Sequence, residues 1–111
     1  MSDVVKAQWF QILFALSAGP LHGSAIVEEV KERTGGRMTL WPGTLYGSLR
    51  DLGKAGWIVE VAAPEDAPSD RGKRRFYELT EAGREQLRAE IQAMRGWVEI
   101  AEARDLLRRP S

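Results

Sequence analysis

Glycine- and proline-containing breaks divide the first half of this chain into short segments, and they constrain its fold more than any other feature. They lie at Ala18-Gly19-Pro20, Thr34-Gly35-Gly36 and Lys54-Ala55-Gly56. Glycine readily takes the left-handed conformation that ends a helix, and proline cannot continue one. Between the breaks, apolar residues recur every three or four positions, which is typical of one helix face. The first half is therefore predicted to form three short helices.

These helices are predicted over residues 4–17, from Ser24 to the break at 34–36, and over residues 42–52. The apolar residues that define their inner faces are Val5, Trp9, Ile12, Leu13 and Leu16, then Ile26, Val27 and Val30, then Leu45, Leu49 and Leu52. Trp9, Phe10 and Trp57 are expected to pack in the core. The outward face of the third helix is expected to be small and polar, formed by Thr44, Tyr46, Gly47, Ser48, Arg50 and Asp51. A face of this kind can lie against a polar partner.

Two strands are predicted next, over residues 57–61 and 74–79, because both segments are rich in β-branched and aromatic residues. Residues 62–73 contain prolines, aspartates and a glycine, so they predict a hairpin with a long tip. The segment 71–75, Arg-Gly-Lys-Arg-Arg, carries four positive charges in five residues. By itself such a cluster is either a solvated loop or a nucleic-acid contact.

A long final helix is predicted from the capping residue Thr80 to about Leu107. Its apolar residues alternate by four and three positions, like a coiled-coil seam: Leu87, Ile91, Met94, Val98 and Ala101. Gly83 and Gly96 each weaken a helix by about 1 kcal/mol, so packing against a partner is expected to hold it. We expect residues 80–111 to belong to the same compact unit as residues 1–79.

The composition excludes several classes of protein. The 111 residues suit a single domain, and no apolar run approaches the roughly 20 residues that cross a bilayer. The N-terminal residues do not form a secretion signal, so a cytoplasmic location is expected. The chain has no cysteine and one histidine, which argues against a metal site, and it carries no catalytic motif, so neither a cofactor nor enzymatic activity is expected. Because 16 basic residues balance 16 acidic ones, any DNA binding must come from local charge.

Three helices, a two-stranded hairpin and a long helix predict an α+β, mostly α fold of the winged helix-turn-helix class. Four motifs occur in it in order: Leu21-His22-Gly23, Pro42-Gly43-Thr44-Leu45-Tyr46, the basic segment 71–75, and Tyr77-Glu78-Leu79-Thr80-Glu81-Ala82-Gly83. With these motifs, residues 10–88 resemble the PadR family of bacterial transcriptional regulators. The resemblance implies a homodimeric repressor that binds double-stranded DNA with its third helix in the major groove. It also implies that residues 1–79 form the winged helix-turn-helix DNA-binding domain and that residues 80–111 form the dimerisation helix. A near-palindromic operator is then expected.

The candidate DNA contacts are Thr44, Tyr46, Ser48 and Arg50 on the third helix and Lys73, Arg74 and Arg75 on the hairpin. Hydroxyl groups and guanidinium groups can bond phosphates and base edges, and Arg50 can pair with guanine through two hydrogen bonds. The alternative is that this winged helix binds other proteins through the same surfaces. A steep salt dependence of DNA affinity would separate the two functions.

The final helix carries a second candidate site. Ile91, Met94, Trp97 and Val98 are assigned to a dimer interface, and some members of the resembled family bind flat aromatic compounds between such helices. Trp97 either stacks on a small aromatic effector or packs in the interface.

Three residues need separate interpretation. His22 is taken as a structural, hydrogen-bonding residue rather than a pH sensor. Trp41 stands where the resembled family often has serine or asparagine, cannot cap the third helix with its side chain, and is expected to pack beneath the start of that helix. Gly47 replaces a common proline and gives either a flexible first turn or a closer approach of the backbone to a phosphate.

Overall fold

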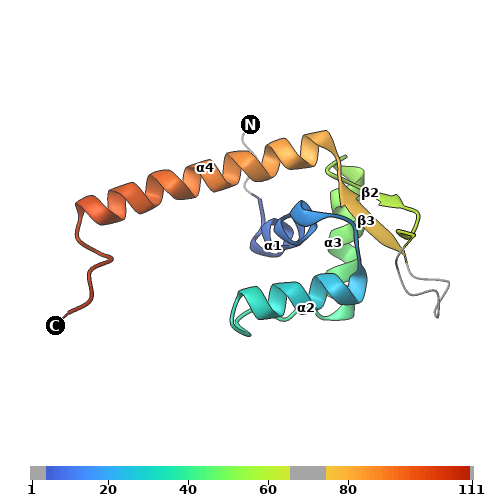
Figure 1. Cartoon of the computed structure of the whole chain (residues 1–111), viewed down its shortest axis with the longest axis horizontal. Coiled ribbons are helices and arrows are strands. Elements are labelled where there is room, and N and C mark those ends of the chain that lie inside the picture. Colours follow the sequence, from blue (N-terminus) through green and yellow to red (C-terminus); the bar gives the residue numbers. More distant parts are fainter. Residues whose placement is uncertain (1–4, 66–74, 111) are drawn as a thin grey trace.

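The structure is a computed structural model that describes residues 5–65 and 75–110. The elements are α1 (Ala7–Ala15), a 3₁₀ turn (Leu16–Ala18), β1 (Leu21–His22), α2 (Gly23–Arg33), α3 (Pro42–Lys54), β2 (Ile58–Val61), β3 (Phe76–Leu79) and α4 (Glu81–Ala103). Helices α1, α2 and α3 pack together below the N-terminal half of α4, and the C-terminal half of α4 projects beyond them (Figure 1). The predicted mostly helical α+β fold with a hairpin is confirmed.

The helix bounds differ from the prediction in places. The first helix is shorter than residues 4–17 and tightens into the 3₁₀ turn before Gly19. The last helix ends at Ala103 rather than near Leu107, because Asp105 takes a positive φ of 59° and the Leu106 N–H returns to the carbonyl of Ala101 at 2.9 Å. This is a helix end of the type that usually contains glycine.

A third strand, β1, was not predicted. Leu21 pairs with Tyr77 and His22 with Phe76, so β3 lies between β1 and β2 in an antiparallel sheet. A strand of two residues is too short to show alternating polarity in the sequence. Its pairing attaches the hairpin to the chain segment that leads directly into α2.

The core lies between the three short helices and the inner face of the sheet. The wholly buried large side chains come from the predicted inner faces: Ile12, Leu13, Leu16, Ile26, Val30 and Leu52. Trp9 and Trp57 pack edge to face against its margin with ring centroids 6.2 Å apart, and Phe10 is also partly buried there. The core assignment of these three aromatic residues is confirmed.

The start of α4 is attached to the turn between α3 and β2. The Thr80 hydroxyl donates to the carbonyl of Gly56 at 2.6 Å and accepts from the N–H of Gly83 at 3.0 Å. The N–H of Thr80 donates to the carbonyl of Trp57 at 3.0 Å. The predicted cap by Thr80 is therefore confirmed, and the same hydroxyl also sets where α4 leaves the sheet.

Candidate nucleic-acid interface

The outward face of α3 carries two glycines near the start of the helix and two basic residues toward its end. Gly43, Gly47, Arg50 and Lys54 follow one another at intervals of four, three and four residues, so they lie on one helix face. A Cβ added at either glycine would meet no heavy atom within 4 Å. Lys54 was not predicted as a contact, although the same spacing relates it to Arg50.

Three of the four predicted contact residues on α3 are exposed. Tyr46 is 56% exposed, Thr44 lies at the side of the outward face, and the Arg50 side chain is 67% exposed. Arg50 Nε lies 3.6 Å from Oδ1 of Asp51, an exposed pair that contributes at most about 1 kcal/mol. The guanidinium of Arg50 can therefore leave this carboxylate for a nucleic acid at little cost.

The placement of Ser48 on the outward face was wrong. Ser48 is buried, with 5% of its surface exposed. It follows Leu45 by three residues and precedes Leu52 by four, so the helix turns it toward the core with these leucines. Its polarity suggested the outer face, whereas its spacing indicates the inner one, and Ser48 cannot reach a ligand on the outer face.

The first motif and the third helix meet at Gly23. A Cβ on Gly23 would lie 3.2 Å from the Tyr46 hydroxyl and 3.3 Å from a methyl group of Leu45. Any side chain at residue 23 would therefore crowd the Tyr46 hydroxyl and this methyl group. Gly23 thus lets the N-terminus of α2 lie close to Tyr46 on the exposed side of the helix-turn-helix.

His22 caps α2, as its structural assignment predicted. Its Nδ1 accepts from the N–H of Ala25 at 3.3 Å, and its ring meets Phe76 of β3 edge to face with centroids 5.3 Å apart. The helix therefore starts at Gly23, one residue before the predicted Ser24.

An exposed cation lies at the base of the hairpin. The Arg75 side chain is 73% exposed, with Nε 4.0 Å from Oε2 of Glu60 on β2. Burial, and next the nearby Glu60 carboxylate, raise the pKa of Tyr77, so its phenol stays protonated near neutral pH. Lys73 and Arg74, the other two hairpin candidates, lie outside the described residues.

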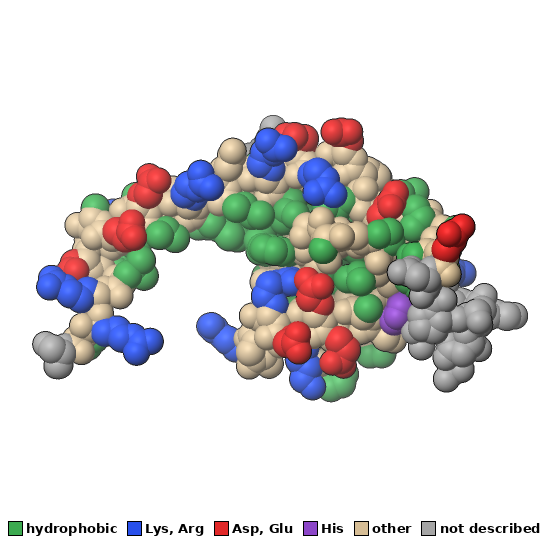
Figure 2. Space-filling view, in the orientation of Figure 1, with side chains coloured by type: hydrophobic (Ala, Val, Ile, Leu, Met, Phe, Trp, Pro, Cys, Tyr) green, Lys and Arg blue, Asp and Glu red, His purple; other side chains and the backbone are tan. Residues whose placement is uncertain are grey.

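Helix α4 leaves apolar side chains uncovered. Ile91, Trp97 and Val98 are 36%, 61% and 47% exposed, and Met94 is partly buried. Hydrophobic side chains lie along the side of α4 that faces the other helices and continue onto its projecting half (Figure 2). A groove of about 350 Å³ beside α4 includes Ile91 and the three arginines Arg84, Arg88 and Arg95, whereas the other predicted effector residues lie outside it.

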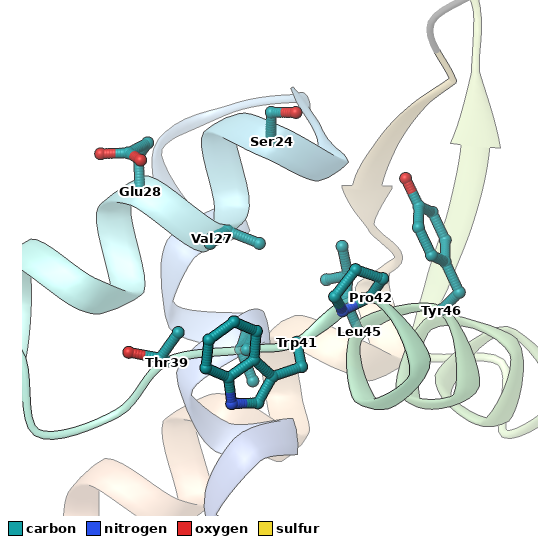
Figure 3. Close-up of a pocket in the computed structure, with 9 residues that line it drawn as sticks. Ser24, Val27, Glu28, Thr39, Trp41, Pro42, Leu45 and Tyr46 are labelled. Atoms are coloured by element: carbon teal, nitrogen blue, oxygen red, sulfur yellow. The ribbon is translucent and has the colours of Figure 1, made fainter.

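Trp41 does not pack beneath the start of α3 as expected. Its side chain is 69% exposed and makes no capping hydrogen bond. It borders a groove of about 320 Å³ between α2 and the start of α3 (Figure 3).

Comparison with known proteins identifies relatives of this fold. The family model described as "Transcriptional regulator PadR-like family" matches residues 12–89. An uncharacterized 37.1 kDa protein in transposon TN4556 of Streptomyces fradiae is 40% identical over 83 residues, which are 75% of this chain and 21% of that protein. The chain thus spans about a fifth of the length of this curated relative.

Two of the solved structures that are similar in fold are PadR proteins. A PadR family transcription regulator from Clostridium difficile R20291 superposes with a TM-score of 0.74 at 23% identity, covering 88% of this chain and 97% of that one. The Bacillus subtilis PadR in complex with operator DNA superposes with a TM-score of 0.64 at 23% identity, covering 78% of this chain and 47% of that one. Within residues 5–65 and 75–110, no helix is both long and apolar enough to cross a membrane.

Proposed function

This chain belongs to the PadR-like family of transcriptional regulators, and from that premise we propose that it binds specific sequences of double-stranded DNA as a homodimer. The observation that carries the proposal is the outward face of α3, where two glycines with open space around them precede Arg50 and Lys54. Backbone without side chains can come close to base edges, and the two cations then meet phosphates or guanine.

The hairpin supplies the second part of the proposed interface. Arg75 is exposed at its base, and the sequence places Lys73 and Arg74 immediately before it. Because the net charge of the chain is zero, DNA affinity must depend on such local groups. The solved Bacillus subtilis PadR is in complex with operator DNA, and its fold similarity supports a corresponding docking of α3 in this chain.

A homodimer would explain the exposed side chains of α4. Ile91 and Val98, together with Met94 between them, follow the alternating spacing that lets two helices pack side by side. Pairing would bury these side chains and place two copies of α3 on successive major grooves, about 34 Å apart. Residues 80–111 are thus proposed as the dimerisation segment, and residues 1–79 as the part that binds DNA.

Repression is the regulatory role that follows most simply from this arrangement, because a dimer bound across an operator obstructs transcription. As a proposed regulator of transcription, the chain is proposed to act in the cytoplasm. Trp97 is 61% exposed in the single chain, so in a dimer its ring would either pack in the interface or stack on a small aromatic effector. An effector that bound there would act by changing the separation of the two α3 helices.

The test is selection of binding sites from a random pool of DNA duplexes, followed by affinity measurements on the selected site at several salt concentrations. A two-fold symmetric sequence and an affinity that falls steeply with salt are expected. If no sequence is enriched, the chain is not a sequence-specific regulator, and a winged helix that binds proteins becomes the better proposal.

Substitutions at the candidate contacts would distinguish residues that bind any DNA from residues that determine the preferred sequence. Alanine at Lys73, Arg74 and Arg75 together should weaken binding to all sequences and reduce the salt slope by about 1 for each phosphate that is no longer neutralised. Arg50→Ala should instead change the preferred sequence. Arg104→Ala, which removes an exposed cation at the end of α4, is the matched control and should change neither property.

A further inference from the structure

Trp41 is an exposed indole at the N-cap of the helix proposed to enter DNA. It precedes Pro42 in extended conformation, with φ −74° and ψ 155°, and its side chain is 69% exposed. Serine or asparagine at this position would cap α3, and tryptophan cannot. The indole therefore contributes neither a helix cap nor core packing, and a partner that covered it would remove its apolar surface from water.

The groove beside Trp41 is mainly apolar. Val27 of α2 faces it from one side, and Trp41 and Pro42 face it from the other (Figure 3). Among the described residues that line this groove, Glu28 is the charged one, and neither lysine nor arginine is present. A phosphate would find no cation there and would be repelled by a carboxylate, so the groove does not suit the DNA backbone.

The groove is continuous with the proposed DNA-binding face. Tyr46 and Ser24 also line it, and Tyr46 is one of the exposed candidate contacts on α3. A duplex seated on the outward face of α3 would therefore present its base edges at the opening of the groove. In the major groove, the 5-methyl of thymine is the apolar group that a base edge offers.

We infer that Trp41, with Pro42 and Val27, forms an apolar contact for the 5-methyl group of a thymine in each operator half-site, and so helps to determine sequence specificity. The inference rests on the proposed DNA-binding function and adds a residue from outside the regular turns of α3. It predicts a thymine preference at the base pair that faces the N-terminus of α3.

The experiment replaces each thymine of the selected operator by uracil, which lacks the 5-methyl group, and measures the affinity of the full chain. Uracil at one position in each half-site should weaken binding by the wild-type protein by about fourfold per half-site, as expected for one buried methyl group. Trp41→Ser should bind the thymine operator more weakly by at least this factor and should not distinguish uracil from thymine at that position. Trp41→Phe, which keeps an apolar ring, should retain part of the discrimination.

Leu106→Ser is the matched control, because it also removes a large exposed apolar side chain, 68% exposed, but at a place far from α3. Leu106 lies just beyond the C-terminal end of α4, and the C-terminal half of α4 projects away from the other helices (Figure 1). This variant should leave the ratio of the affinities for the thymine and uracil operators unchanged. The inference is overturned if the wild type binds its operator specifically but tolerates uracil at every position, or if Trp41→Ser keeps the full uracil effect. Specific binding by the wild type in either case would leave the proposed function standing, whereas absence of any selected site would overturn both.

Discussion

Gly83 lies in the first turn of α4, directly against the backbone that leads into β2. A Cβ at this position would lie 2.0 Å from the carbonyl oxygen of Trp57 and 2.8 Å from its carbonyl carbon. The same carbonyl accepts the N–H of Thr80 at 3.0 Å, so it cannot move away without breaking the attachment of α4. From the sequence, Gly83 was the last residue of the fourth motif and was expected to weaken the helix. In the structure it permits the helix and the sheet to meet.

Replacing Gly83 by alanine should therefore destabilise the protein although alanine is the better helix former. We expect the free energy of unfolding to fall by about 3 kcal/mol, at the upper end of the range for overpacked sites, as measured by urea denaturation. Gly96→Ala is the matched control in the same helix, because a Cβ there meets no heavy atom within 4 Å, and it should gain up to about 1 kcal/mol. Equal effects of the two substitutions would contradict the close contact at Gly83.

Among the elements, α3 has one face that packs in the core and an opposite face whose glycines weaken the helix. Its inner face, with Leu45, Leu49 and Leu52, holds the helix in the core, and its outer face carries glycines that weaken the helix. Helical stability is thus supplied by packing, and the outer face is left free for a close partner.

Gly47→Ala tests the role of the outer face. A Cβ at Gly47 touches nothing in the free protein, so the substitution should raise the free energy of unfolding by about 0.5–1 kcal/mol. It should also weaken operator binding by about tenfold if the backbone of α3 approaches the DNA closely, because the methyl group would occupy that contact. A stabilised variant with unchanged operator affinity, measured by titration at fixed salt, would place the close approach elsewhere.

At the scale of the whole molecule, α4 is longer than the body of one chain can cover. The molecule extends 53 Å along its longest axis and 36 and 26 Å along the others, and the C-terminal half of α4 projects beyond the packed helices (Figure 1). Ile100 is 49% exposed on this half, in addition to the seam residues described above. A second copy of the chain packed against this helix would bury these exposed apolar side chains.

Ile91→Asp tests this arrangement. When two α4 helices pair, a carboxylate in the seam would lose its water against the apolar side chains of the other helix, so the variant should sediment as a monomer and lose operator binding, which needs two half-sites. Gln92→Asp adds the same charge at the next exposed position and should remain dimeric. A variant Ile91→Asp that stays dimeric would show that the interface lies elsewhere on the chain.

Elements that depend on local spacing could be predicted from the sequence. Apolar periods and breaks predicted the four helices, their inner faces and the two hairpin strands, and the Leu-His-Gly segment correctly indicated a structural histidine. The burial of Ser48 was also present in its spacing from Leu45 and Leu52, although its polarity favoured the outer face. These features are available from the sequence because helix and strand periods relate residues that are close in the chain.

Features that bring distant segments together are known only from the three-dimensional arrangement. The pairing of β1 with β3, the contact of Gly83 with the backbone of Trp57, and the meeting of Gly23 with Tyr46 all join separate elements. The exposure of Trp41 depends in the same way on where α2 lies relative to α3. The periods of helices and strands do not predict such contacts, because the packing of the whole core determines which surfaces meet.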